Sequence, residues 1–299
     1  MDPPNVLWYF GAFTLGFAVY ELIATIPTSQ SGLWILLTAL GFLTGFALGS
    51  AVLLRRGWWV PGGLATALAV AVFPAVAVAF LTLIGVWPDG PFFEPLERFS
   101  GYTFGVGLAT AAVGLAAWWL TRFSFVLAVA IGAILISAQL LTPCFDESPS
   151  GGERAAMALV IGAVLFVIGV LVDALGRRRE AFWFEVLGLF SLAAGLVFLT
   201  VDAGGDPDRG WIPMLIGGAA LLIAAAPVGR ATWAVYGVFG LYATVVHYLA
   251  KELNERRWPF ALLLIALSVA LVALGMAEQR YGRAWAQRFV RRPPPELTP

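Results

Sequence analysis

Residues 33–86 read LWILLTALGFLTGFALGSAVLLRRGWWVPGGLATALAVAVFPAVAVAFLTLIGV, and this stretch decides the fold. It holds two apolar blocks, residues 33–54 and 62–86, on either side of a short break that contains arginine, tryptophan, proline and glycine. An α-helix needs about 20 apolar residues to cross the hydrocarbon of a bilayer. We therefore expect two membrane-spanning helices joined by a tight turn.

The rest of the chain repeats this pattern. Of its 299 residues, 60% are hydrophobic and 12% are charged, whereas soluble domains carry about 25% charged residues. The blocks lack the in/out alternation of barrel strands. The sequence thus predicts an all-α, polytopic transmembrane bundle of about ten spans, at residues 6–26, 33–54, 62–86, 101–120, 124–143, 155–175, 182–201, 211–228, 231–250 and 258–277.

Tryptophan and arginine support these spans and predict their direction. All 12 tryptophans fall at or just outside a predicted span edge, where the amphipathic indole ring prefers to lie. With the N-terminus inside, 12 of the 18 Lys and Arg residues lie in inner segments. The positive-inside rule then predicts an inner-membrane protein with both termini in the cytoplasm. We expect a membrane domain of residues 1–277 and a cytoplasmic tail of residues 278–299.

Several classes of function lack their sequence signals. The net charge is zero, which argues against a nucleic-acid partner, and no extramembrane stretch is long enough for a soluble catalytic domain. With one histidine and one cysteine, a zinc site of the usual composition cannot be built. The first apolar block lacks a basic segment before it and is interpreted as a retained helix. We expect no metal, no cofactor and no enzymatic activity.

Small residues recur on one face of two predicted spans. Gly41, Gly45 and Gly49 share a face of the second span, and Gly101, Gly105 and Ala109 share a face of the fourth. Such faces let two helix backbones approach closely in lipid. Packing within the bundle is the expected use, and a homo-oligomer formed through Gly41, Gly45 and Gly49 is the alternative.

Two acidic residues flank the hairpin around residues 173–185. Asp173 and Arg177 are four residues apart, a spacing that brings both onto one helix face. Glu185 lies within about two turns of the same inner interface. We expect structural ion pairs between these carboxylates and the arginines at positions 177–179, with side chains that extend toward the interface.

Three polar residues lie at a similar depth near the outer ends of their predicted spans. Glu21, Gln139 and His247, the only histidine, place an acid, an amide and an imidazole in one layer. We hypothesise that Glu21 and His247 meet in a polar pocket that would carry a proton or bind a cationic group. Alternatively, His247 bonds to a backbone carbonyl and Glu21 pairs with Lys251. Side chains more than about 8 Å apart would exclude the pocket.

The C-terminal tail combines aromatic and basic residues. Tyr281, Trp285 and Phe289 are spaced by four, so a helix would align them in a stripe among arginines that include Arg288, Arg291 and Arg292. An aromatic stripe with arginines is typical of an interfacial helix on anionic lipid. The arginines also fit a simpler role as topology determinants.

Some segments resemble a bacterial family of predicted multi-span membrane proteins. They include FGAFTLGFAVYEL in the first span, RFSFVLAVA at the fifth, REAFWFEVLGLF entering the seventh and VYGVFGLYATVVHYLAKEL in the ninth. The resemblance implies an inner-membrane protein of unassigned activity and supplies no functional residue.

Three functions compete on these observations, and an intramembrane enzyme is the least favoured of them. A small-molecule or proton-linked transporter is the working hypothesis, favoured by the number of spans and by the layer of Glu21, Gln139 and His247. A non-catalytic scaffold, sensor or assembly component is the alternative, favoured by the scarcity of polar groups near the middle of the spans. The lipid bilayer is the expected partner in each case.

Overall fold

The computed structural model describes residues 3–24, 32–87, 99–145, 150–201 and 208–253, together with Ile265. The chain forms two compact units, residues 1–191 and residues 192–299, and each is described by itself. The predicted tenth span (258–277) and the tail with its aromatic and basic residues lie outside the described residues. The predicted division into residues 1–277 and 278–299 stays a prediction.

Every regular element of the described residues is a helix, which confirms the all-α prediction. The first unit holds α1 (Pro3–Ala24), α2 (Gly32–Arg55), α3 (Trp59–Leu83), α4 (Gly101–Thr121), α5 (Phe125–Leu140), the short 3-10 helix η2 (Thr142–Cys144) and α6 (Gly151–Ala174). Helix α7 (Arg178–Val201) begins in the first unit and ends in the second, which also holds α8 (Asp208–Val228) and α9 (Ala231–Leu253).

Seven of these described helices, α2 to α8, are long and apolar enough to cross a membrane. The apolar part of α1, Leu7–Ile23, is shorter, and α9 carries tyrosines, a tryptophan and His247 among its apolar residues. The chain is therefore a multi-span helical membrane protein. The full count of ten spans stays a prediction.

The helices end where glycine releases the backbone from the helical conformation. Gly57 after α2 and Gly176 after α6 both have φ of 80°, a left-handed conformation that glycine adopts without strain at helix C-termini. The turn between α2 and α3 is shorter than the predicted break, because α3 begins at Trp59 and includes Pro61. A proline in the first turn of a helix leaves no hydrogen bond unmade, since the N–H it lacks has no partner there.

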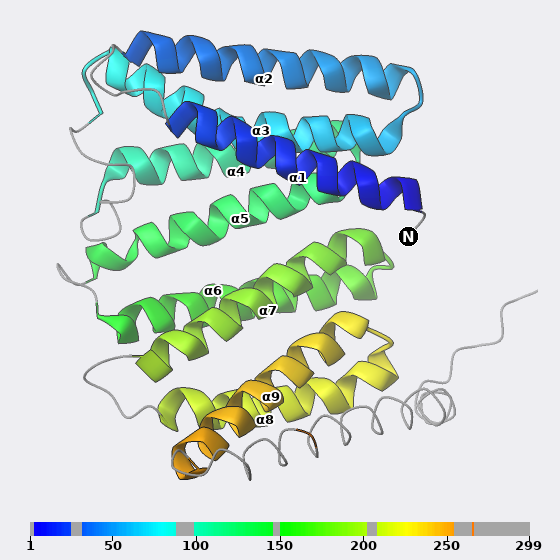
Figure 1. Ribbon diagram of the computed structural model, residues 1–299, viewed down its shortest axis with the longest axis vertical. Coiled ribbons are helices and arrows are strands. Elements are labelled where there is room, and N and C mark those ends of the chain that lie inside the picture. Colours follow the sequence, from blue (N-terminus) through cyan, green and yellow to red (C-terminus); the bar gives the residue numbers. More distant parts are fainter. Residues whose placement is uncertain are drawn as a thin grey trace, which may run out of the picture. The chain divides into compact units, whose positions relative to one another are not determined.

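Within the first unit, the N-terminal end of α1 and the turns that follow α2, α4 and α6 lie at one end, as Figure 1 shows. We call this the arginine end, because it carries exposed arginines in the α2–α3, α4–α5 and α6–α7 turns: Arg55, Arg56, Arg122, Arg177, Arg178 and Arg179. Aromatic contacts join the helices there. The Phe125 ring lies edge-on to Tyr9 at 5.6 Å and to Trp183 at 5.1 Å between ring centroids.

The predicted glycine face of α2 is not used for packing within the described part of the chain. A Cβ added at Gly41, Gly45 or Gly49 would meet no atom within 4 Å, and the same holds for Gly105 of α4. The expectation of bundle packing at these positions is therefore wrong for the described residues. The close approaches occur elsewhere, because packing depends on which face of a helix meets a neighbour and not on the glycine spacing alone.

Other glycines make the close approaches, among them two on α7 and α8. A Cβ at Gly188 of α7 would lie 2.7 Å from Phe166 N on α6, and one at Gly218 of α8 would lie 2.9 Å from Gly237 O on α9. Both distances are shorter than real Cβ contacts. Each helix pair thus packs backbone against backbone, as small residues permit in a membrane.

We predict that Gly188→Ala destabilises the protein by about 1–3 kcal/mol, because the added methyl group would push α6 and α7 apart. A lowered melting temperature of the full chain in detergent would show this. Gly132→Ala in α5 is the matched control, since a Cβ there meets no atom within 4 Å. Equal melting temperatures of the two variants would contradict the close contact between Gly188 and Phe166.

Candidate functional site

The most buried ionisable side chain of the described residues is Glu185 of α7, which is 1% exposed. It lies against α6, where a Cβ added to Gly169 would come within 2.9 Å of Glu185 Cγ and 3.0 Å of Glu185 N. Only a glycine leaves room for the carboxylate side chain at this point. Glu185 therefore sits inside the contact between two candidate membrane spans.

The rest of the α6/α7 contact is made of small and apolar side chains. Helix α6 contributes a buried stripe of Ala155, Ala158, Gly162, Leu165 and Gly169. From α7, Ser191 is buried and its Oγ donates a hydrogen bond of 2.8 Å to Ala158 O. We call this contact the α6/α7 seam. It encloses the side chain of Glu185, which is 1% exposed.

Glu185 lies near the start of α7, as the sequence predicts, and its expected ion pair with the arginines at positions 177–179 stays a prediction. It follows the start of α7 at Arg178 by seven residues, which corresponds to about 10 Å along the helix. The sequence analysis expected a side chain that reaches for the interface. Because the side chain is buried in the seam, the group is withdrawn from the surface, and burying an ionisable group is costly unless it is hydrogen-bonded or paired.

Asp173 pairs with a different arginine from the one that the sequence spacing indicates. Its Oδ1 lies 3.6 Å from Arg178 Nε. Helix α6 ends at Ala174, so Asp173 and Arg177 do not share a helix face, but the pair with Arg178 agrees with the expected pairing to the arginines at positions 177–179. The Arg178 side chain is 58% exposed, and an ion pair so open to solvent contributes little to stability.

The three residues of the predicted polar pocket have separate surroundings. Glu21 is exposed on α1. Gln139 of α5 is half-buried, and its Nε2 donates a hydrogen bond of 3.4 Å to Arg154 O on α6. No hydrogen bond links Glu21 to Gln139 in the described part of the chain. His247 belongs to the second unit, so its meeting with Glu21 stays a prediction.

His247 has an aromatic partner that the sequence analysis missed. Its ring stacks on Trp211 of α8, with centroids 4.2 Å apart and planes 12° from parallel. Beside it, Tyr248 Oη donates a hydrogen bond of 2.8 Å to Asp208 Oδ1. These two contacts join the end of α9 to the start of α8. Trp211 and Asp208 lie in the segment that follows a predicted loop, and only the hairpin geometry brings them to α9.

The buried hydroxyl of Thr244 completes this end of the hairpin. Its Oγ1 donates to Gly240 O at 2.8 Å, one turn earlier in α9. The close approach of Gly218 and Gly237 sets the distance between α8 and α9, and the side-chain contacts follow from it. The arrangement orders the imidazole of His247 against an indole.

Within the described residues, no three His, Cys, Asp or Glu side chains are grouped as a metal site. Comparison of the chain with family models, with curated proteins and with solved structures finds no match. The resemblance noted in the sequence therefore identifies no family.

We predict that Tyr248→Phe weakens the junction of α8 and α9 by about 0.5–3 kcal/mol, because it removes only the hydroxyl that bonds to Asp208. Faster hydrogen exchange at the first-turn amides of α8 would reveal the loss. Tyr242→Phe is the matched control on the same helix, where the side chain is exposed. Unchanged exchange in Tyr248→Phe would mean that the hydrogen bond contributes nothing to this junction.

Proposed function

We propose that this multi-span membrane protein is a transporter of a small molecule or of protons, and that Glu185 is its proton- or cation-binding group. The supporting observation is the complete burial of one carboxyl group between two candidate membrane spans. Ionisable residues inside membrane segments are rare and typically belong to ion or proton pathways. The close contact of Glu185 with Gly169 of α6 places this group between two helices that both could cross the membrane.

In this proposal, movement at the α6/α7 seam controls access to the carboxyl group of Glu185. Glu185 touches Gly169, and Gly188 lies one turn away against Phe166. A shift of α7 along α6 would move the carboxyl group out of its enclosed position, because the backbones are in direct contact and leave no slack. Release of the proton or cation is then coupled to the opening of the seam.

We predict that a hydrophobic carbodiimide modifies Glu185 in the full chain embedded in liposomes. Such reagents partition into the bilayer and react with carboxyl groups there. Peptide mass mapping would locate the adduct. Glu185→Gln should lose it, whereas Glu180→Gln, five residues earlier on α7, should keep it.

The same variants test transport itself. Proton flux into liposomes that contain the full chain, followed with an enclosed pH-sensitive dye, should fall to the background level in Glu185→Gln and persist in Glu180→Gln. A carboxyl group that never reacts at any pH, together with no flux, would contradict the transporter proposal.

A non-catalytic scaffold or assembly component is the second candidate, and a different observation favours it. The glycine face of α2 is open in the described part of the chain, with no atom within 4 Å of a Cβ added at Gly41, Gly45 or Gly49. Leu37 and Leu48 flank it and are 50% and 68% exposed. We propose that a second copy of the chain packs here, since small residues let helix backbones approach in lipid.

We predict that Gly41→Ile combined with Gly45→Ile lowers the mass of the detergent-solubilised particle to that of one chain. Light scattering after gel filtration would measure this mass. Gly105→Ile is the matched control, because Gly105 of α4 is equally open. A particle of unchanged mass would argue against this interface.

The remaining features are proposals of the same kind. The arginine end of the first unit supports a bacterial inner-membrane orientation with a cytoplasmic N-terminus, by the positive-inside rule. An even number of spans would bring the C-terminus to the same side, where the basic tail would meet anionic lipid. We propose no catalytic role, and we retain the pocket of Glu21, Gln139 and His247 as a proposed outer site.

A further inference from the structure

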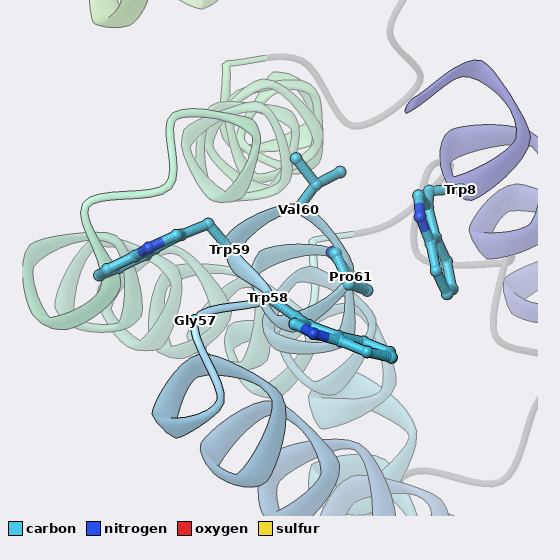
Figure 2. A pocket seen from close by; sticks show the side chains of 6 residues that line it. All are labelled: Trp8, Gly57, Trp58, Trp59, Val60 and Pro61. Carbon is cyan, nitrogen blue, oxygen red and sulfur yellow. The ribbon is translucent and has the colours of Figure 1, made fainter. Parts of the chain in front are cut away.

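An open pocket lies at the arginine end, between α1 and the α2–α3 turn. It has a volume of about 430 Å³ and is lined by Trp8, Gly57, Trp58, Trp59, Val60 and Pro61. Figure 2 shows the Trp8 ring across from Trp58 and Pro61. The pocket walls are therefore mainly aromatic.

The tight α2–α3 turn keeps these indole rings at the surface. Gly57 turns the chain with φ of 80°, and Trp58 is the residue that caps α3. Trp8, Trp58 and Trp59 are 45%, 53% and 63% exposed. Large exposed aromatic side chains that ring an open pocket mark an interaction site, and at the ends of membrane spans they lie at the level of the lipid headgroups.

Positive charge adjoins the aromatic walls. Arg55 and Arg56 are exposed and directly precede Gly57, while neither α2 nor α3 contains an acidic residue. At the same end, the Arg122 guanidinium lies 5.8 Å from the Trp118 ring and 5.9 Å from the Trp119 ring. The charge pattern therefore favours an anionic occupant with an apolar portion.

We propose that this pocket binds an anionic phospholipid at its headgroup. Arg55 and Arg56 would contact the phosphate, since guanidinium groups form strong charge-assisted hydrogen bonds with phosphate oxygens. Trp8, Trp58 and Pro61 would contact the glycerol backbone and the first carbons of the acyl chains. A free phosphate ion would leave these aromatic walls without a partner, so the lipid satisfies both parts of the site. The site is independent of Glu185 and goes beyond the proposed function.

The test is photo-crosslinking of the purified full chain in detergent with a phosphatidylglycerol analogue that carries a diazirine near its headgroup. Peptide mapping should place the crosslinks in residues 55–61 and around Trp8. Unlabelled phosphatidylglycerol should displace the probe, whereas phosphatidylcholine and glycerol 3-phosphate should not. Competition by phosphatidylcholine would indicate nonspecific annular lipid, competition by glycerol 3-phosphate would indicate a phosphate site, and either result would overturn the proposal.

Variants separate charge from aromatic contact. Arg55→Gln with Arg56→Gln should weaken crosslinking at residues 55–61 about tenfold or more, given about a fivefold effect for each arginine near an anionic surface. Arg55→Lys with Arg56→Lys should keep most of it, and Trp58→Ala should lose part of it. Arg177→Gln with Arg179→Gln is the matched control, since it removes the same charge from another turn of the arginine end. Equal loss in the control would overturn the assignment, as would full labelling of the Arg55→Gln, Arg56→Gln chain.

Discussion

A bilayer offers no water to the backbone, and the rest of this structure depends on that constraint. Helices satisfy it, because each N–H and C=O pairs within its own segment. Side-chain hydroxyl groups also form hydrogen bonds within their own helix. Thr14, Thr82, Thr110 and Ser137 each donate their hydroxyl hydrogen to the carbonyl oxygen four residues earlier. Polar groups that close on their own helix do not attract a neighbouring helix, so packing depends on shape.

Shape complementarity explains why glycine and the few inter-helix hydrogen bonds matter here. Ser50 on α2 and Thr66 on α3 share a buried hydrogen bond of 2.6 Å, and Thr66 also donates to Gly62 O within its own helix at 3.1 Å. Next to this pair, Gly62 packs so closely that a Cβ would lie 2.8 Å from Leu54 Cγ. Hydroxyl pairs form where glycine has already brought two helices together. The glycine contacts therefore set the distance between the two helices, and the hydrogen bond between Ser50 and Thr66 adds to the contact.

The sequence predicts the helical class and several boundaries well where composition controls them. The predicted second span ends one residue before the end of α2 at Arg55, and the predicted third span begins three residues after the start of α3 at Trp59. Charge, positive φ and the missing proline N–H act locally at this turn. The sequence does not predict which residues contact a neighbouring helix, because these contacts depend on the rotation of each helix about its axis. Gly41 and Gly188 look alike in the sequence, yet one is open and the other touches Phe166. Glu185 shows the same limit, since sequence gives its depth but not the face on which it lies.

His247 shows a second limit, which concerns the kind of partner sought. From the sequence, a carboxylate is the expected partner of His247, because opposite charges are easy to recognise in a sequence. The structure pairs the imidazole with the Trp211 ring, and the nearby acid, Asp208, accepts its hydrogen bond from Tyr248 instead. A flat stacked contact carries no signature in the spacing of two residues 36 positions apart, so only the hairpin reveals it.

The enclosed position of Glu185 is compatible with transport because of how glycine seams respond to displacement. When two helices are displaced, contacts between side chains change gradually because rotamers adjust. The close backbone contacts at Gly169 and Gly188 have no such freedom. Such a seam changes between discrete arrangements, as closely packed interfaces do in other conformational switches. A carboxyl group inside such a seam is either enclosed or accessible, with few intermediate positions. The proposed transporter would need that property of its binding group.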